Sequence, residues 1–215
     1  EPVDQPVVTL LAAPRDPVQP LVTTEAQLAE AVAALALGTG SFAIDAERAG
    51  GFRYTQRAYL IQIRRRESGT WLIDPTADLD FRPLAEVMDQ DEWVLHAANQ
   101  DLPCLAELGL VPRELFDTEL AGRLLGNARV GLSAMTEAHM GVTLAKEHSA
   151  ADWSTRPFPA EWLTYAALDV ELLLDLRDLL DAELRAIGRR DWAQEEFEAV
   201  RLAPPTPPPT GATPS

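Results

Sequence analysis

The sequence is poor in cysteine, in basic residues and in long apolar runs. One cysteine, Cys104, cannot form an internal disulfide or a multi-cysteine zinc site, and it is typical of a reducing compartment. Eighteen lysine and arginine residues against 34 aspartate and glutamate residues give a net charge of −16, which argues against coating nucleic acid through bulk charge. No apolar run reaches the ~18 residues that span a bilayer, and the first residues lack the basic start of a secretory signal. We therefore expect a soluble, cytoplasmic protein that does not bind membranes.

Prolines are concentrated at the two ends of the chain. Residues 1–20 hold five of the 17 prolines, and residues 204–215 hold six. The tail after Leu202 has no bulky apolar residue to bury, so it cannot offset the entropy lost on ordering. We expect a disordered segment over 1–20, one folded domain over 21–203, and a linker or disordered tail over 204–215.

The central residues alternate between strand and helix patterns. Thr24 is a suitable N-cap for a helix that ends at Gly38, and the turn at Glu67 to Gly69 predicts a hairpin. The expected strands cover 42–47, 58–66, 69–75, 93–99 and 115–118, and the expected helices cover 82–88, 100–109, 118–126, 132–141, 159–188 and 191–202. This order predicts an α/β layered domain with a mixed sheet and a helical C-terminal part.

Two acidic residues lie on one face of the first of these strands. Because side chains alternate along a strand, Asp45 and Glu47 project from the same face, about 6.6 Å apart along it. They could belong to a solvent-facing strand edge. The apolar neighbours Phe42, Ile44 and Ala46 instead favour a central strand, where adjacent anions need a cation.

Three further residues have acid or hydroxyl side chains at informative positions. Asp101 follows the fourth strand at the head of a helix, where a carboxylate can simply cap free backbone amides. Tyr165 and Asp169 lie one turn apart on one helix face beside an apolar stripe. An acid next to the core requires a partner, which could be the tyrosine itself.

Taken together, these residues resemble the three exonuclease motifs of the DEDD superfamily, tyrosine subtype. The motifs are Asp45-x-Glu47, Asp101 and Tyr165-x3-Asp169, and the flanking segments WVLHAANQDLPCL and LFDTELAGRLLG are similar to those of ribonuclease D. The resemblance runs from about Phe42 to Leu180 and implies an RNase H-like fold with a mixed five-stranded sheet flanked by helices. One departure is Arg48, where many relatives have an aromatic or aliphatic residue.

The resemblance implies a metal-dependent 3′-5′ exonuclease that releases nucleoside 5′-monophosphates. It assigns Asp45, Glu47 and Asp169 to one divalent ion, with Asp45 bridging to a second ion and Asp101 acting there partly through water. Tyr165 would position the attacking water. Carboxylate oxygens favour Mg²⁺ or Mn²⁺, and the sequence lacks the histidine and cysteine clusters that zinc prefers.

Substrate contacts are expected around the strand hairpin and before the third motif. If the second strand runs antiparallel to the first, Arg53 and Arg57 lie at the end that carries the acids and could contact phosphate. Phe52 could stack on a base, and it could equally belong to the core. Lys146 and His148 are similar to family positions near the site, although a surface role is open. At the far hairpin, arginines 64–66 are expected to form a solvated face, and His96 is expected to be a hydrogen-bonded structural residue.

The expected substrate is the 3′ end of RNA, as in trimming of tRNA or other stable RNA. A DNA-directed 3′-5′ exonuclease and a catalytically silent RNA-binding domain are the alternatives. Relatives of the ribonuclease D type carry a helical HRDC domain after the nuclease domain, and this chain stops in a Pro-rich segment where that domain would begin. The resemblance therefore predicts a fragment or an unusually short member.

Overall fold

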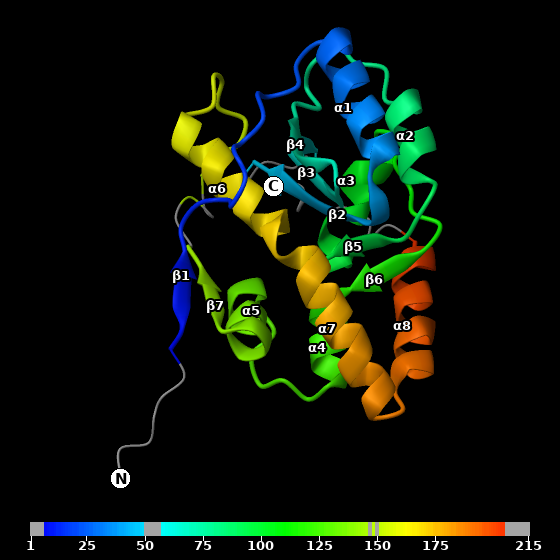
Figure 1. Cartoon of the computed structure of the whole chain (residues 1–215). Helices are drawn as coiled ribbons and strands as arrows, with labels where there is room; N and C mark the ends of the chain where they lie inside the picture. The colour runs from blue at the N-terminus through cyan, green and yellow to red at the C-terminus, as the bar shows by residue number, and fades with distance from the viewer. Residues whose placement is uncertain (1–6, 50–56, 146–147, 149–150, 205–215) are drawn as a thin grey trace, which may run out of the picture.

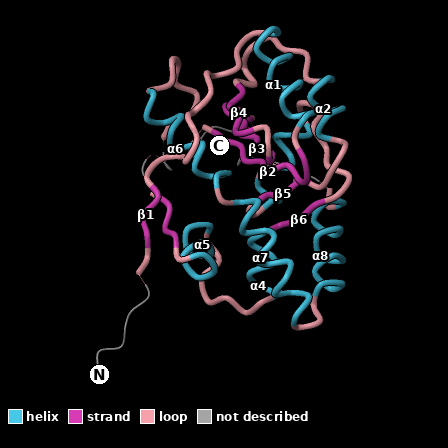
Figure 2. The backbone as a smooth tube through the Cα atoms, in the orientation of Figure 1, coloured by secondary structure: helices cyan, strands magenta, loops and turns pink. Residues whose placement is uncertain are grey.

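The computed structural model describes residues 7–49, 57–145, 148 and 151–204. Its centre is a five-stranded mixed sheet in the order β4-β3-β2-β5-β6, as the cartoon and the tube show (Figures 1 and 2). β2 pairs antiparallel with β3 and parallel with β5. The strands are β2 (Thr39–Arg48), β3 (Ala58–Arg66), β4 (Gly69–Ile73), β5 (Trp93–Leu95) and β6 (Leu115–Asp117). The predicted mixed sheet and the hairpin between β3 and β4 are confirmed.

The alternation of β2 divides its side chains between two cores. Phe42, Ile44 and Ala46 are buried in the first core, together with apolar residues of α1 (Glu25–Leu37), α2 (Arg82–Met88) and α3 (Leu102–Ala106). Ala43 lies on the opposite face, in a second core with residues of α4 (Thr118–Leu124), α5 (Leu132–Met140), α7 (Leu173–Ala186) and α8 (Arg190–Leu202). Asp45 follows Ala43 by two residues, so it shares the second face.

α6 (Ala160–Glu171) covers the same second face farther along the sheet. Ala166 and Ala167 pack with Leu60 of β3, Leu72 of β4 and Trp153 in a third, smaller core. Small alanine side chains let the helix approach the strands closely. This packing brings the C-terminal half of α6 next to the end of β2 that carries Asp45 and Glu47.

The helix predicted over 159–188 is interrupted, and that part of the prediction is wrong. α6 ends at Glu171 and α7 begins at Leu173, with Leu172 between them at φ −106° and ψ 0°. The Glu171 carbonyl accepts a hydrogen bond from the Arg15 guanidinium at 3.2 Å, and the Glu171 carboxylate accepts another at 2.8 Å. Arg15 thus satisfies groups at the break, and no local sequence pattern could indicate a partner 156 residues away.

The expectation of disorder over residues 1–20 is wrong for residues 7–20. β1 (Thr9–Leu11) pairs parallel with β7 (Val142–Leu144), and Val22 forms a bridge with Ile73 at the end of β4. Prolines set φ without preventing an extended chain, and the segment between Pro6 and Pro14 keeps all its amide donors. The Pro-rich composition therefore permits a strap along the domain; residues 1–6 and 205–215 lie outside the described part.

The expected solvated face at arginines 64–66 is wrong for Arg65. Its side chain donates hydrogen bonds to the Leu35 and Gly40 carbonyls at 2.8 and 2.9 Å and lies 4.2 Å from the Phe42 ring centroid. Leu35 lies in the last turn of α1, where backbone acceptors lack helical partners, and Gly40 lies at the start of β2. The buried Arg65 guanidinium is therefore hydrogen-bonded to main-chain acceptors, which a sequence pattern does not reveal.

A bidentate ion pair ties the segment before α6 to the sheet. Arg156 donates to both carboxylate oxygens of Asp74 at 3.0 and 2.9 Å, and to the carbonyls of Tyr59 and Trp153. Burial raises the pKa of Asp74, but the hydrogen bonds from Arg156 and Thr76, together with the Arg156 charge, outweigh burial and lower the pKa. Among the described helices, none combines the length and apolarity that a bilayer crossing requires.

We predict that Asp74→Ala lowers the free energy of unfolding by about 3 kcal/mol, because it leaves a partly buried guanidinium without its carboxylate. Chemical denaturation at neutral pH measures the change. Asp80→Ala, which breaks the exposed pair between Arg82 and Asp80, is the matched control and should have little effect. Equal effects of the two substitutions would contradict a special contribution from the Asp74 pair.

Candidate metal-dependent active site

Asp45 and Glu47 project from β2 toward α6, as the alternation predicts. Gln62 of β3 is the cross-strand partner of Asp45, and its side-chain amide donates to Glu47 Oε1 at 3.2 Å and to the Ala166 carbonyl at 3.2 Å. Gln62 is fully buried. It therefore holds the Glu47 carboxylate between the strand and α6.

Asp101 reaches the same place from the end of β5. The chain turns there through Ala97 at φ 58°, and the Asp117 carboxylate accepts the Ala97 and Ala98 amides at 3.1 and 2.9 Å. Asp101 occupies the N-cap position of α3 but makes no side-chain capping bond, so the simple capping interpretation is wrong. Its carboxyl group is hydrogen-bonded to Asp45 instead.

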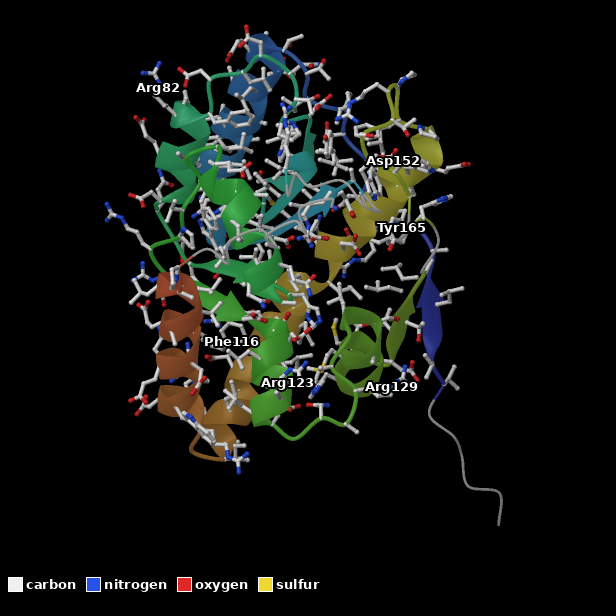
Figure 3. All side chains as sticks on the ribbon, turned by 180° about the vertical axis from the view of Figure 1, so that it is seen from behind. Arg82, Phe116, Arg123, Arg129, Asp152 and Tyr165 are labelled. Carbon is white, nitrogen blue, oxygen red and sulfur yellow. The ribbon has the colours of Figure 1, made fainter. Side chains whose placement is uncertain are left out.

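Asp169 completes the cluster from α6. Its carboxyl group is hydrogen-bonded to both Asp45 and Glu47. One carboxylate oxygen from each of Asp45, Glu47 and Asp169 lies within 4.8 Å of the other two. Tyr165 lies one turn earlier on α6 and lines a cavity with Asp169. Four carboxyl groups from β2, the start of α3 and α6 thus lie in one place. Figure 3 labels Tyr165, which lies on α6.

The carboxyl groups suppress one another's ionisation. Burial, followed by the charge of Asp45, raises the pKa of Glu47 to about 8. Burial and the Asp45 charge also raise the pKa values of Asp101 and Asp169 well above their ordinary range, and burial raises that of Asp45. Without a cation, the cluster holds protons that ordinary carboxylates release.

The cluster fits a divalent cation with oxygen ligands. Three carboxylate oxygens within 4.8 Å of one another can approach one ion, and the raised pKa values show that negative charge there lacks compensation. Mg²⁺, Mn²⁺ and Ca²⁺ favour such hard oxygen ligands. His96 is not among the residues whose ligand atoms converge here, and its Nδ1 lies 2.8 Å from the Thr118 hydroxyl, as expected of a hydrogen-bonded histidine.

The proposed substrate residues are only partly described. Arg57 is exposed and immediately precedes β3, opposite the Arg48 end of β2, so the predicted antiparallel geometry is present. The His148 ring centroid lies 6.0 Å from that of Tyr165. Phe52, Arg53 and Lys146 lie outside the described residues.

Two residues that position the carboxylates, Gln62 and Asp117, were not predicted from the sequence. Gln62 is the only polar residue between Tyr59 and Ile63 of β3, and this interruption of an apolar strand was a usable signal. Asp117 accepts four backbone amides, two before Asp101 and two at the start of α4. Its capping of α4 could be predicted, but its contact with residues 97 and 98 requires the fold.

A cavity of about 320 Å³ opens beside the cluster. It is lined by the chain before α5, the first turn of α5, β7 and α6, including Arg129, Ser133, Leu144, Tyr165 and Asp169. The acidic cluster therefore borders a space in which a bound molecule can reach Tyr165.

Residues 20–185 match the family model described as 3′-5′ exonuclease. The chain is 37% identical over 195 residues to Ribonuclease D of Zymomonas mobilis, covering 88% of this chain and 49% of that protein. A crystal structure of a Bifidobacterium adolescentis protein is 47% identical with TM-score 0.88, covering 92% of this chain and 49% of that one. That of Escherichia coli RNase D, an exoribonuclease involved in structured RNA processing, is 30% identical with TM-score 0.79, covering 87% and 50%. The chain spans about half the length of these relatives.

We predict that the metal-free protein becomes less stable as pH rises from 4.5 to about 8, the ordinary and the raised pKa of Glu47. The folded state holds a proton over this range that the unfolded chain releases, so the free energy of unfolding falls with pH. Mn²⁺ or Mg²⁺ at ~100 times its dissociation constant should raise the free energy of unfolding by about 2.7 kcal/mol, which corresponds to a rise of roughly 5–10 °C in Tm.

Thermal unfolding across this pH range, with chelator or with metal, measures both effects. Metal stabilisation should be larger at the alkaline end, because the ion binds the deprotonated carboxylates. Asp169→Asn should reduce it, whereas the distant surface substitution Asp80→Asn should leave it unchanged. Stability of the metal-free protein that is flat or rises with pH would contradict the electrostatic account.

Proposed function

Since the chain belongs to the 3′-5′ exonuclease family, we propose that it is a metal-dependent exoribonuclease that removes nucleoside 5′-monophosphates from RNA 3′ ends. One observation carries this proposal. Carboxylate oxygens of Asp45, Glu47 and Asp169 lie within 4.8 Å of one another, with Asp101 bonded to Asp45. This cluster faces the cavity that Tyr165 lines.

Asp45, Glu47 and Asp169 would hold one ion, and Asp45 with Asp101 would hold a second, with Mg²⁺ or Mn²⁺ as the ions. When bound, the ions supply Lewis-acid stabilisation of the negative charge that develops on the phosphate and on the leaving 3′ oxygen. Gln62 fixes the Glu47 carboxylate for this task. Divalent ions bind deprotonated carboxylates, so the protons that Asp101 and Asp169 hold because of their raised pKa values would be released to solvent when ions bind.

Tyr165 would orient the attacking water against the last phosphodiester. Its place on α6, one turn before Asp169, puts both side chains at the wall of the same cavity. The His148 ring, 6.0 Å away edge to face, limits the movement of the tyrosine ring. Attack in line with the leaving 3′ oxygen leaves the phosphate on the departing nucleotide, which is why the product is a 5′-monophosphate.

Arg57 would contact the substrate backbone at the acidic end of the hairpin, and Arg53, Phe52, Lys146 and His148 complete the proposed substrate set. The RNA substrate is proposed because the relatives named above include an exoribonuclease involved in structured RNA processing. Trimming of tRNA or other stable RNA 3′ ends in the cytoplasm fits that relationship. An HRDC domain after this segment would add contacts to RNA and raise the affinity for it.

We predict that the purified protein with Mn²⁺ or Mg²⁺ shortens 5′-labelled single-stranded RNA stepwise from its 3′ end and that chelator abolishes the activity. Asp45→Ala and Asp169→Ala should lower kcat/KM by at least about 100-fold, since each tenfold corresponds to ~1.4 kcal/mol of lost transition-state stabilisation. Tyr165→Phe, which retains the ring and removes the hydroxyl, should lower kcat by about 100-fold and leave metal binding intact. Wild-type activity no higher than that of Asp45→Ala would refute the proposal.

We predict that RNA is degraded faster than DNA of the same sequence and length under the same conditions. Matched single-stranded oligonucleotides in parallel time courses measure the ratio, and a single 2′-deoxy residue at the 3′ end identifies which nucleotide is recognised. Faster DNA degradation would assign the domain to DNA, with the same active site and a different substrate.

A further inference from the structure

Most arginines of this chain lie in ion pairs. With 34 acidic and 18 basic residues, carboxylates are in excess, and pairs such as Arg66 with Asp178 are the rule. Among the residues that the structure describes, the arginines with no carboxylate oxygen within 4.0 Å are Arg48, Arg57, Arg129 and Arg189. An arginine left without a partner in so acidic a chain requires an explanation.

Three of these four arginines border the carboxylate cluster. Arg48 directly follows Glu47, and Arg57 precedes β3 at the same end of the sheet. Arg129 lines the cavity with Tyr165 and Asp169. Two of the four have other partners: Arg189 donates to the Leu124 carbonyl and lies over the Trp192 ring, and Arg57 lies 6.0 Å from the Tyr59 ring centroid.

Arg129 is held in place by its neighbours along the chain. Val130 and Leu132 pack against the second core, which anchors the segment between α4 and α5. The exposed Arg129 side chain is therefore presented at the cavity wall from a fixed backbone. Figure 3 shows Arg129 and Tyr165 on the same side of the molecule, with Arg123 on the neighbouring helix α4.

We propose that Arg129 binds a backbone phosphate of the single-stranded substrate in this cavity. The inference rests on the proposed exonuclease function, because it takes the cavity as the path of the strand that reaches Tyr165 and Asp169. A guanidinium can donate two parallel hydrogen bonds to a phosphate, and it supplies positive charge where the acidic surface would otherwise repel the strand. Arg129 would thus set substrate affinity without reading bases.

The other role open to Arg129 is compensation of the carboxylate charge. In that role its removal would strengthen divalent metal binding, because a nearby like charge is lost, and would leave the affinity for nucleic acid unchanged. The phosphate-binding role has the opposite signature: the metal requirement stays the same and the KM for the strand rises. The two roles therefore separate in a single variant.

The test compares wild type, Arg129→Gln, Arg129→Lys and the control Arg123→Gln, whose arginine is also exposed but pairs with Glu119 on α4. Steady-state degradation of single-stranded RNA is measured over a range of salt concentrations, with metal half-saturation measured in parallel. Arg129→Gln should raise KM about tenfold, and the slope of log KM against log salt should fall by about 0.7, the value for one phosphate contact to a single strand.

Arg129→Lys should keep the salt slope and recover part of the affinity, and Arg123→Gln should behave as wild type. An unchanged KM and salt slope for Arg129→Gln would overturn the inference while leaving the exonuclease function in place. If wild type does not degrade RNA, the proposed function fails. Fluorescence anisotropy of labelled single-stranded RNA with Ca²⁺ then decides the inference alone, and equal affinities of wild type and Arg129→Gln would refute it.

Discussion

The mutual repulsion of carboxylates gathered at one point is the constraint on which the rest of this structure depends. Asp45, Glu47, Asp101 and Asp169 come from three separate elements, and each would be better solvated apart. Packing forces them together. β2 is a central strand with apolar neighbours on one face, and α6 is held against the other face by small alanines and by Trp153. The energy of the packed cores holds the acids in place until a cation compensates them.

Hydrogen bonds and ion pairs around the cluster hold the mutually repelling carboxylates in place. Gln62 donates hydrogen bonds to Glu47 and to the backbone of α6. Asp117 accepts a backbone amide in the turn before Asp101. Arg156, in the segment before α6, pairs with Asp74 at the end of β4. Each partner is buried or half-buried, where a hydrogen bond to a charged group contributes more than it does in water. The N-terminal strap adds Arg15 at the break between α6 and α7. Residues remote in sequence therefore share the task of fixing α6, the element that contributes both Tyr165 and Asp169.

The distribution of positive charge is as informative as that of the acids. Most described arginines form ion pairs at the surface and between helices, whereas Arg48, Arg57 and Arg129 have no carboxylate oxygen within 4.0 Å. Among the described residues, three of the four arginines without a carboxylate partner lie toward the cluster, so a polyanionic substrate would meet unpaired positive charge mainly there.

The sequence by itself predicted the mixed sheet and most helices, and it placed Asp45 with Glu47 and Tyr165 with Asp169, because alternation along β2 and the one-turn spacing on α6 are local properties. It also indicated, through resemblance, that these residues belong together. Only the tertiary structure decided which distant residues support the site. Gln62 bonds to Glu47, and Asp117 accepts amides of the turn before Asp101. Arg15 bonds to the break between α6 and α7, and Arg129 lines the cavity. The physical reason is that strand and helix periodicity concern neighbours in the chain, whereas burial, pKa and ion pairing depend on groups brought close by packing, such as Arg15 and Glu171, which are 156 residues apart.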